Sequence, residues 1–279
     1  MSRGTAAVVG LGLMGGSLAR ELAARGHRVI GFDRDPETVA AARAEGVDAH
    51  SLPATPTGAA ELAGVDLLVL AVPVAAAAPL LAQLLPRLAA DCVVTDLGST
   101  KREIAAAAAE LGISERFVGG HPLTGDHRAG WAASRRGLFE GARVFLCATP
   151  NTRPAALARV RALWSDLGAL PLETTAGEHD RTVAWSSHLP QITSSALALV
   201  LEGAGFTRPE LGPGGRDATR LAASSPEMWS AICRENADLI EPAVAALEER
   251  LSDLRRALRD GDADAIHLFF TRGSRWAQA

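Results

Sequence analysis

Short apolar runs alternate with helical patterns through the first half of the chain. The apolar runs predict strands at residues 6–10, 28–33, 67–72, 92–96, 116–119 and 143–148. Helical patterns, such as those at residues 12–25 and 36–45, lie between them. Parallel strands need crossover connections of this kind, whereas antiparallel strands can be joined by a short hairpin. The alternation therefore predicts an α/β fold built on a doubly wound parallel sheet.

The pattern changes after about Pro171, where no further strand is predicted. Helical spacing predicts helices at residues 177–201, 228–241, 242–259 and 262–276. Among them, residues 203–225 are rich in Gly, Pro, Arg and Ser, which predicts a loop followed by a short helix. We therefore expect an α/β domain over residues 1–172 and an all-helical domain over residues 173–279.

One predicted helix carries a regular apolar stripe. Its residues are Ile240, Val244, Leu247, Leu251, Leu254 and Leu258, spaced alternately four and three apart. Heptad spacing of this kind fits a contact between two copies of the chain, and it fits a helix packed within its own domain equally well. Pro242 has no backbone N–H, so it should start or kink this helix.

Composition and charge exclude several classes of protein. Hydrophobic residues make up 48% of the chain, which excludes a disordered protein. The net charge is −4 and no long basic run is present, so we expect no nucleic-acid partner. The apolar run at 67–73 is too short to cross a membrane, and the N-terminus enters a strand without a signal peptide. We therefore expect a cytoplasmic protein.

The cysteines and histidines do not predict a metal site. Cys92, Cys147 and Cys233 are far apart and odd in number, and the histidines do not combine with them in a metal-binding spacing. Small buried thiols in a reducing compartment account for the three cysteines. We therefore expect no metal.

A glycine-rich turn follows the first predicted strand. Gly10, Gly12 and Gly15 have the G-x-G-x-x-G spacing, and Leu13 and Met14 open the helix that follows. In a dinucleotide-binding turn, the first glycine allows a tight turn, the second lets a pyrophosphate approach, and the third lets helix and strand pack closely. The helix N-terminus then presents free N–H groups to the anion. The turn predicts a dinucleotide site.

Asp33 ends the second predicted strand, 18 residues after Gly15. A carboxylate at this point accepts hydrogen bonds from the adenosine ribose and repels a 2′-phosphate, which favours NAD over NADP. Arg34 follows at once and works against that preference. Together with the glycine turn, Asp33 makes residues 1–172 an expected NAD-binding Rossmann domain.

Two further strand ends belong to the expected cofactor site. Val72 and Pro73 follow one buried strand, and Gly98 follows the next. Ligands of such sheets bind outside the carboxyl ends of the strands. Ordinary strand-end turns would produce the same residues, so these positions support the cofactor site only in combination with the glycine turn.

Motifs along the whole chain carry a family resemblance. They are GLGLMGGS at 10–17, DLGSTK at 96–101, GGHPLTG at 119–125, SHLP at 187–190, RDATRLA at 216–222, SPEMW at 225–229, and Asn236. In this order and spacing they resemble the prephenate/arogenate dehydrogenase family. The resemblance implies a Rossmann domain, a helical dimerisation domain that forms a homodimer, and an active site at their junction. It also implies an NAD-dependent oxidative decarboxylation that makes a cyclohexadienyl ring aromatic.

The resemblance assigns three catalytic candidates. His121 matches the family's catalytic base, and a neutral imidazole is a suitable proton acceptor at pH 7. A histidine that caps a strand end is the alternative. Ser99 is expected to orient His121 or the substrate hydroxyl, although it could also be the N-cap of the following helix. His188 matches a second active-site histidine, with a packed helix histidine as the alternative.

The substrate candidates begin with Arg220, which matches the family's carboxylate-binding arginine, because a guanidinium binds carboxylates in a bidentate way. Arg216 lies four residues earlier, so a continuous helix would place both arginines on one face. Asp217 is expected to orient one of them. A solvated charged face is the alternative for all three.

Three more residues complete the substrate candidates. Lys101, the only lysine, is expected to reach the substrate or the second domain. Trp229 would line the pocket, unless it is a core residue. Gln191 stands where many relatives have histidine, which bears on recognition of the substrate side chain.

The resemblance leaves the substrate open. Oxidation of prephenate to 4-hydroxyphenylpyruvate and CO2, a step of tyrosine biosynthesis, is the first expectation. Arogenate and 4-amino-4-deoxyprephenate are the alternatives. A β-hydroxyacid dehydrogenase is disfavoured because residues 178–201 contain no lysine. A catalytically dead nucleotide sensor is disfavoured because His121 and Arg220 are both present.

Overall fold

The computed structural model describes residues 4–52, 60–125 and 128–279. The chain divides into two compact units. The first runs to Thr182 and also includes Ala223–Glu235, while the second comprises Val183–Ala222 and Asn236–Ala279. The expected boundary at residue 172 remains a prediction. The contacts assign residues 173–182 and 223–235 to the α/β unit.

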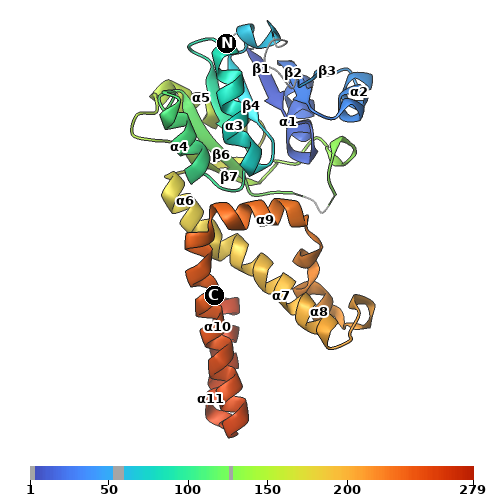
Figure 1. The fold of residues 1–279 in the computed structure, drawn as a ribbon, viewed down its shortest axis with the longest axis vertical. Helices are drawn as coiled ribbons and strands as arrows, with labels where there is room; N and C mark the ends of the chain where they lie inside the picture. The colour runs from blue at the N-terminus through green and yellow to red at the C-terminus, as the bar shows by residue number, and fades with distance from the viewer. Residues whose placement is uncertain (1–3, 53–59, 126–127) are drawn as a thin grey trace. The chain divides into compact units, whose positions relative to one another are not determined.

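The first unit is built on an eight-stranded sheet in the order β3-β2-β1-β4-β5-β6-β7-β8 (Figure 1). The strands are β1 (Thr5–Val9), β2 (Arg28–Asp33), β3 (Asp48–Ser51), β4 (Leu67–Leu70), β5 (Val93–Asp96), β6 (Phe117–Pro122), β7 (Arg143–Cys147) and β8 (Leu170–Thr174). Chain order reverses between β1 and β4, as in doubly wound sheets. The predicted α/β class is confirmed.

Helices cover both faces of this sheet. They are α1 (Leu13–Ala24), α2 (Pro36–Ala44), α3 (Val74–Leu84), α4 (Arg102–Glu110) and α5 (Pro154–Asp166). Two further helices follow later in the chain, α6 (Ala176–Val183) and α9 (Pro226–Glu235). Successive residues of β1 point to opposite faces, because side chains alternate along a strand. Val8 therefore packs with α1 and α5 in one core, whereas Val9 packs with α3 and α4 in the other.

The sequence did not predict the antiparallel pairing of β6 with β7, in which His121 lies opposite Phe145. Over its described residues, the connection between these strands contains the short 3-10 turn η4 (Trp131–Ala133) and no crossover helix. Strand β7 returns in the opposite direction. Side chains of α1 hold this connection. The Ser17 hydroxyl accepts a hydrogen bond from the Arg135 amide (2.9 Å).

Both edge strands were also missed. β3 has the polar sequence Asp-Ala-His-Ser, which lacks an apolar alternation. β8 lies beyond the point where strands were expected to end, and it contains Pro171. A proline is tolerated at the edge of a sheet, where one side of the strand makes no ladder hydrogen bonds. Edge strands of this kind are formed by pairing with a neighbour rather than by their own sequence pattern.

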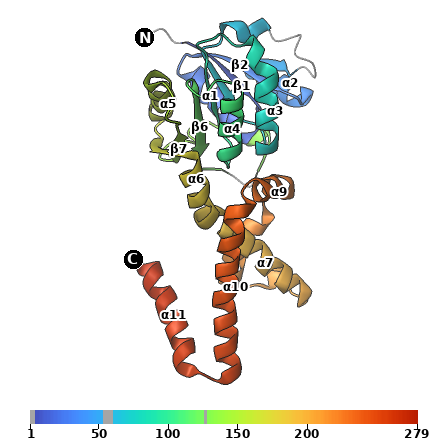
Figure 2. The same cartoon turned by 60° about the vertical axis from the view of Figure 1, so that its left-hand side comes forward.

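The second unit is helical, and its helices are α7 (Leu189–Gly203), α8 (Pro213–Ala218), α10 (Ala237–Asp260) and α11 (Ala263–Gln278). Helices α10 and α11 form an antiparallel hairpin (Figure 2). Gly261 ends α10 with φ at 69°, a left-handed conformation that glycine adopts without strain. The Asp262 side chain then caps α11 through the Ala265 amide.

Two predicted helix boundaries were wrong. The helix expected at 177–201 is interrupted by the π-helical turn η5 (Ala184–His188). The break expected at Pro242 lies instead at Asn236, and Pro242 is inside α10. The apolar stripe is buried at Ile240, 6% exposed, whereas Leu251 and Leu258 are 54% and 60% exposed. Within the described residues, no helix has the length and apolar character needed to span a membrane.

Candidate active site

The glycine turn after β1 has the geometry that a dinucleotide requires. Gly10 has φ at 94°, and a Cβ atom there would lie 2.4 Å from the Ala71 carbonyl oxygen. A Cβ atom at Gly15 would lie 1.8 Å from the Gly10 carbonyl oxygen, so helix and strand pack too closely for any side chain. A Cβ atom at Gly12 would meet nothing within 4 Å. The turn is therefore tight where it packs and open where a pyrophosphate would approach.

The first turn of α1 faces this open space. Gly12 is its N-cap and offers no side-chain hydrogen bond to the backbone N–H groups of the helix. Leu13 and Met14 are the first two residues of α1. An N-terminus without a side-chain cap binds anions through its N–H groups and the positive end of the helix dipole. These residues fit the pyrophosphate of a dinucleotide.

Asp33, at the end of β2, is held in place by the backbone around it. Its Oδ2 atom accepts a hydrogen bond from the Leu11 amide (2.6 Å), and its Oδ1 atom accepts one from the Asp35 amide (2.9 Å). A carboxylate has about four acceptor positions, so two remain for ribose hydroxyls. The adjacent Arg34 is exposed. The carboxylate is therefore fixed in orientation beside the glycine turn.

The remaining cofactor candidates follow neighbouring strands. Val72 and Pro73 lie between β4 and α3, and Pro73 is the N-cap of α3. Gly98 follows β5, where its amide donates to Asp96 Oδ2 (2.8 Å). A Cβ atom at Gly98 would lie 2.9 Å from the same oxygen. These positions are on the carboxyl side of the sheet, as the sequence predicted.

Asp96 organises the loops that carry the catalytic candidates. It is 1% exposed. Besides Gly98, its carboxylate accepts a hydrogen bond from the Gly120 amide at Oδ1 (3.1 Å). A Cβ atom at Gly120 would lie 2.6 Å from the Asp96 carbonyl oxygen, so the close approach of the two strands requires glycine. His121 is the next residue and is half-buried. Asp96 thus fixes the backbone immediately before His121.

Lys101 is completely buried, and its ammonium pairs with Asp96 Oδ2. This position differs from the substrate contact expected from the sequence. The charge of the only lysine instead balances the buried carboxylate that holds Gly98 and Gly120. A buried charge without a partner is very costly, which explains why the pair occurs together.

His121 contacts a second histidine that sequence reasoning left outside the site. Its Nδ1 atom lies 2.8 Å from Nε2 of His179 on α6. The Nδ1 atom of His179 lies in turn 2.7 Å from Oδ1 of Asp180. His179 and Asp180 are 0% and 1% exposed. No sequence signal identified this pair, because His179 and His121 are separated by 58 positions and share no motif.

The protonation of this chain of groups follows from its surroundings. Burial lowers the pKa of His179, and the hydrogen bond to Asp180 offsets only part of that effect. Burial alone would raise the pKa of Asp180, but hydrogen bonds from His179 and from the Arg102 and Lys101 amides outweigh it and bring the pKa below the ordinary value. At neutral pH, His179 is therefore neutral and Asp180 is ionised.

Ser99 is half-buried in the loop after β5. The N-cap of α4 is Lys101 rather than Ser99, and its own side chain makes no capping hydrogen bond. Asp180 caps the helix instead, through the Lys101 and Arg102 amides (2.8 and 2.9 Å). The N-cap interpretation of Ser99 is therefore wrong.

Trp229 is half-buried on α9, which packs against α3.

The second unit contains the other histidine candidate. His188 is 1% exposed and ends the π-helical turn η5. The Asn236 side-chain amide donates to its Nδ1 atom (3.2 Å). An amide nitrogen can only donate, so the ring proton of neutral His188 lies on Nε2. π-helical turns are frequent at functional sites.

The arginine candidates do not share a helix face. Helix α8 ends at Ala218, and Arg220 begins the separate 3-10 turn η7 (Arg220–Ala223). The expectation of one continuous helix is therefore wrong. Arg216 Nη1 donates to the Leu211 carbonyl oxygen (2.6 Å), whereas the side chains of Arg220 and Asp217 are exposed.

Gln191 is buried on α7. Its side-chain amide donates to the Leu221 carbonyl oxygen (2.7 Å). Leu221 directly follows Arg220, so Gln191 holds the segment that carries this arginine. The sequence predicted a substrate contact for Gln191, and the hydrogen bond to Leu221 adds a structural function.

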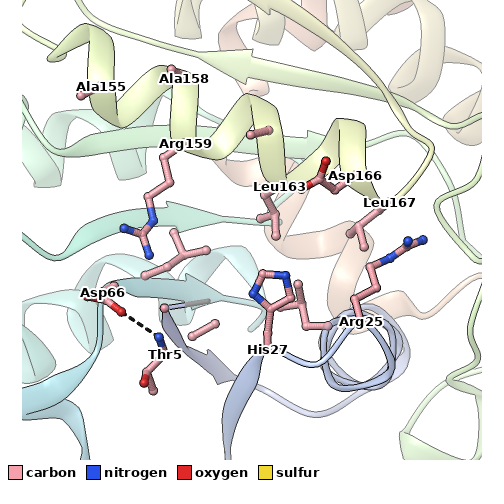
Figure 3. A pocket seen from close by; sticks show the side chains of 15 residues that line it. Thr5, Arg25, His27, Asp66, Ala155, Ala158, Arg159, Leu163, Asp166 and Leu167 are labelled. Atoms are coloured by element: carbon pink, nitrogen blue, oxygen red, sulfur yellow. Dashed lines mark hydrogen bonds between the residues drawn. The ribbon is translucent and has the colours of Figure 1, made fainter. Parts of the chain in front are cut away.

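A hollow of about 970 Å³ lies at the amino ends of the strands, opposite the end that carries the glycine turn (Figure 3). It is lined by residues at the amino ends of β1, β2 and β4 and by α5, including Arg25, His27, Arg159 and Asp166. Asp66 at its rim accepts a hydrogen bond from the Thr5 amide (2.7 Å). Ligands of doubly wound sheets bind at the carboxyl ends of the strands. This hollow is therefore separate from the candidate active site.

An open glycine turn, a carboxylate fixed beside it and a strand-end histidine on the same side of one sheet define a dinucleotide-dependent oxidoreductase. Residues 18–171 match the family model of the prephenate dehydrogenase nucleotide-binding domain. Residues 175–272 match the model of the prephenate dehydrogenase dimerization domain. The chain belongs to the prephenate dehydrogenase family.

Individual relatives agree with this assignment. The prephenate dehydrogenase of Bacillus subtilis (strain 168) is 31% identical over 274 residues, which cover 95% of this chain and 73% of that protein. The crystal structure of the A. aeolicus enzyme in complex with hydroxyphenyl propionate and NAD+ has a TM-score of 0.87 at 29% identity, covering 100% of this chain and 99% of that one. Synechocystis arogenate dehydrogenase has a TM-score of 0.80 at 30% identity, covering 99% and 100%.

Proposed function

We propose that this chain catalyses the NAD-dependent oxidative decarboxylation of prephenate to 4-hydroxyphenylpyruvate and CO2, a step of tyrosine biosynthesis. The observation that carries the proposal is the position of His121. It lies at the carboxyl end of β6, in the sheet whose β1 leads into the glycine turn, and it is backed by the buried His179–Asp180 pair. A base is thereby available at the edge of the sheet where a nicotinamide would lie.

The first unit would hold NAD through groups already described. The α1 N-terminus and Gly12 would bind the pyrophosphate, and Asp33 would accept hydrogen bonds from the adenosine ribose. Val72, Pro73 and Gly98 would line the path of the cofactor. When bound, NAD would supply the acceptor for the hydride that leaves the ring carbon bearing the hydroxyl. Arg34 is exposed next to Asp33, and its charge would work against the preference that Asp33 sets.

His121 would take the proton of the ring hydroxyl as the C–H bond breaks. The ring carboxylate would leave as CO2, and the ring would become aromatic. Ser99 would orient the hydroxyl toward the imidazole. Asp96 supports this step indirectly, because it fixes the Gly120 amide next to His121. Lys101 would act through Asp96 rather than through the substrate.

Arg220 would bind a substrate carboxylate, since its guanidinium is exposed and provides a bidentate donor. Arg216 and Asp217 would contribute charge, and Gln191 would keep the Arg220 segment in position. His188, oriented by Asn236, would present its Nε2–H group to the substrate side chain. Trp229 would contribute apolar surface for the ring.

We propose that the protein is a cytoplasmic homodimer formed through the helical unit, with no nucleic-acid or membrane partner. The support is the large apolar surface of that unit, which a monomer would leave in water. The exposed large apolar residues of this unit are Trp185, Leu197, Leu199, Val200, Phe206, Leu251, Leu258, Leu268, Phe270 and Trp276. Burial raises the pKa of Cys147 to about 12 and that of Cys92 to about 11, so neither thiol is reactive.

The second candidate is an arogenate or 4-amino-4-deoxyprephenate dehydrogenase. The observation that favours it is Gln191. Its side chain is engaged by the Leu221 carbonyl oxygen in this structure, whereas a histidine could present a positive charge to a keto acid side chain. For 4-amino-4-deoxyprephenate alone, which has an amine on the ring in place of the hydroxyl, the need for His121 as a base would also be weaker.

The test is to supply NAD with prephenate, arogenate and the amino analogue in turn. Formation of reduced nicotinamide is followed by absorbance, and the aromatic product and CO2 are quantified. We expect the highest kcat/KM with prephenate. A higher value with arogenate or the amino analogue would establish the alternative, and no turnover with any of them would overturn the proposed function.

A further inference from the structure

We propose that His179 is a positioning residue that holds His121 in its Nδ1-protonated tautomer, so that Nε2 of His121 is the atom that accepts the substrate proton. The proposal rests on the proposed function for its catalytic consequence. The tautomer itself can be observed without substrate.

Asp180 is fixed at the N-terminus of α4. Its Oδ1 and Oδ2 atoms accept hydrogen bonds from the Lys101 and Arg102 amides (2.8 and 2.9 Å). Arg102 Nε also donates to Oδ2 (3.3 Å). Backbone N–H groups and guanidinium groups can only donate. Several donors thus converge on the two oxygens, which favours the ionised carboxylate, and these hydrogen bonds lower the pKa of Asp180.

The Asp180 carboxylate orients the ring of His179. Its Nδ1 atom lies 2.7 Å from Asp180 Oδ1, so Nδ1 carries a proton and donates a hydrogen bond to the carboxylate. A neutral imidazole has one N–H group and one acceptor nitrogen. The Nε2 atom of His179 is therefore the acceptor, and it lies 2.8 Å from Nδ1 of His121. His121 must donate from Nδ1, which leaves its Nε2 atom as the basic nitrogen.

A charged His179 would reverse this arrangement. Its Nε2–H group would donate to His121, and the proton of a neutral His121 would then lie on Nε2, where it could not accept another. Burial opposes that state, because His179 is 0% exposed and its pKa is lowered mainly by desolvation. The neutral state is thus the one consistent with the surroundings.

Packing prevents the His179 ring from turning away. The Phe145 ring stands nearly perpendicular to it, with ring centroids 5.1 Å apart. Phe145 lies opposite His121 in the antiparallel pairing of β6 with β7. The antiparallel pairing, which the sequence did not predict, therefore places Phe145 where its ring packs against His179 and keeps that ring directed toward His121.

In the reaction, the O–H bond of the ring hydroxyl breaks and a bond forms between the proton and His121 Nε2. His121 becomes an imidazolium and keeps its Nδ1–H bond to His179. Asp180 remains ionised and stabilises the new positive charge through the neutral His179, without taking the proton itself. The proton passes from Nε2 to water after product release.

The experiment compares the wild-type protein with His179→Gln and His179→Phe. Glutamine places an amide oxygen near the position of imidazole Nε2 and can still accept from His121, whereas phenylalanine cannot. Nitrogen-15 NMR of the histidine rings reports which nitrogen of His121 is protonated, with His121→Asn used to assign its signals. We expect Nδ1–H in the wild-type protein and in His179→Gln. In His179→Phe we expect a shift to Nε2–H.

Kinetics provides the second readout. We expect His179→Phe to lower kcat about 10- to 100-fold, part of the general-base contribution, with KM and NAD affinity within about 2-fold. His179→Gln should retain most of kcat. An Nε2–H tautomer of His121 in the wild-type protein would overturn the proposal, even if a variant failed to fold. Absence of turnover with every substrate would instead refute the proposed function and leave the NMR result standing.

Discussion

Lys101 and Asp96 form an ion pair in which the two side chains are 0% and 2% exposed. The pair links two loops of the candidate active site, because Asp96 also holds the amides of Gly98 and Gly120. The only lysine of the chain is thus part of the framework behind His121. Its effect on catalysis would be transmitted through the backbone that it helps to position.

Lys101→Met should therefore destabilise the protein strongly. It leaves the Asp96 carboxylate buried without its cation, which typically costs about 3–5 kcal/mol of unfolding free energy. Urea unfolding at neutral pH measures this loss. Arg161→Met is the matched control, because Arg161 pairs with Glu173 on the surface and such pairs contribute about 0–1 kcal/mol. Equal small losses in both variants would show that the buried pair has no special structural importance.

His121→Asn should lower kcat about 100-fold or more, the range expected for loss of a general base. NAD affinity, measured by calorimetry, should remain nearly unchanged, because the glycine turn and Asp33 are untouched. His267→Asn serves as the control, since His267 is exposed on α11. An unchanged kcat in His121→Asn would remove this residue from the mechanism.

Asp33→Ser should relax the preference for NAD over NADP. The serine removes the carboxylate that repels a 2′-phosphate, and Arg34 beside it can then attract one. The ratio of kcat/KM with the two cofactors measures the change. Asp35→Ser should leave that ratio unaltered, because Asp35 caps α2 and serine is also a good N-cap. A constant ratio in Asp33→Ser would show that the preference lies elsewhere.

Arg220→Ala should raise KM by about 10-fold or more, because a charged hydrogen bond to a carboxylate is worth about 1.5–3 kcal/mol. Steady-state kinetics and thermal unfolding are measured together. Arg216→Ala should raise KM less, because Arg216 donates to the Leu211 carbonyl oxygen. If Arg220→Ala changed only the melting temperature, Arg220 would be a structural residue.

The stability of the wild-type protein should fall more steeply with acidity than that of His179→Gln. The pKa of His179 is lowered in the folded state, so below about pH 6.5 the unfolded chain binds a proton that the folded protein does not. The contribution of His179 to the free energy of unfolding is therefore fully present above about pH 6.5, and it is lost as the pH falls toward the pKa of His179 in the folded protein. The slope is at most about 1.4 kcal/mol per pH unit.

Urea unfolding of both proteins between pH 7.5 and pH 5, roughly the range around the unperturbed histidine pKa, tests this prediction. The difference between the two curves isolates His179 from the other histidines. The free energy of unfolding of the wild-type protein, taken relative to that of His179→Gln, should decrease as the pH falls. A constant difference across the range would mean that His179 has the same pKa in the folded and unfolded states.

The sequence by itself determined the features that depend on near neighbours. The spacing of Gly10, Gly12 and Gly15, directly after an apolar run, was enough to predict the turn that the structure contains. The position of Asp33 at the end of a strand followed from the same local pattern. Strand and helix periodicities are set by residues two to four positions apart, so the α/β class could be predicted from the sequence alone.

Only the tertiary structure decided which distant residues meet. His179 lies beside His121 because β7 reverses direction and α6 follows β8, and Lys101 is buried because Asp96 requires a cation. The helix break lies at Asn236 and not at Pro242. The side-chain amide of Asn236 also donates a hydrogen bond to His188. These outcomes depend on strand pairing, burial and charge balance between segments far apart in the chain. Local propensity does not encode such long-range contacts, and tertiary packing overrides it where the two conflict.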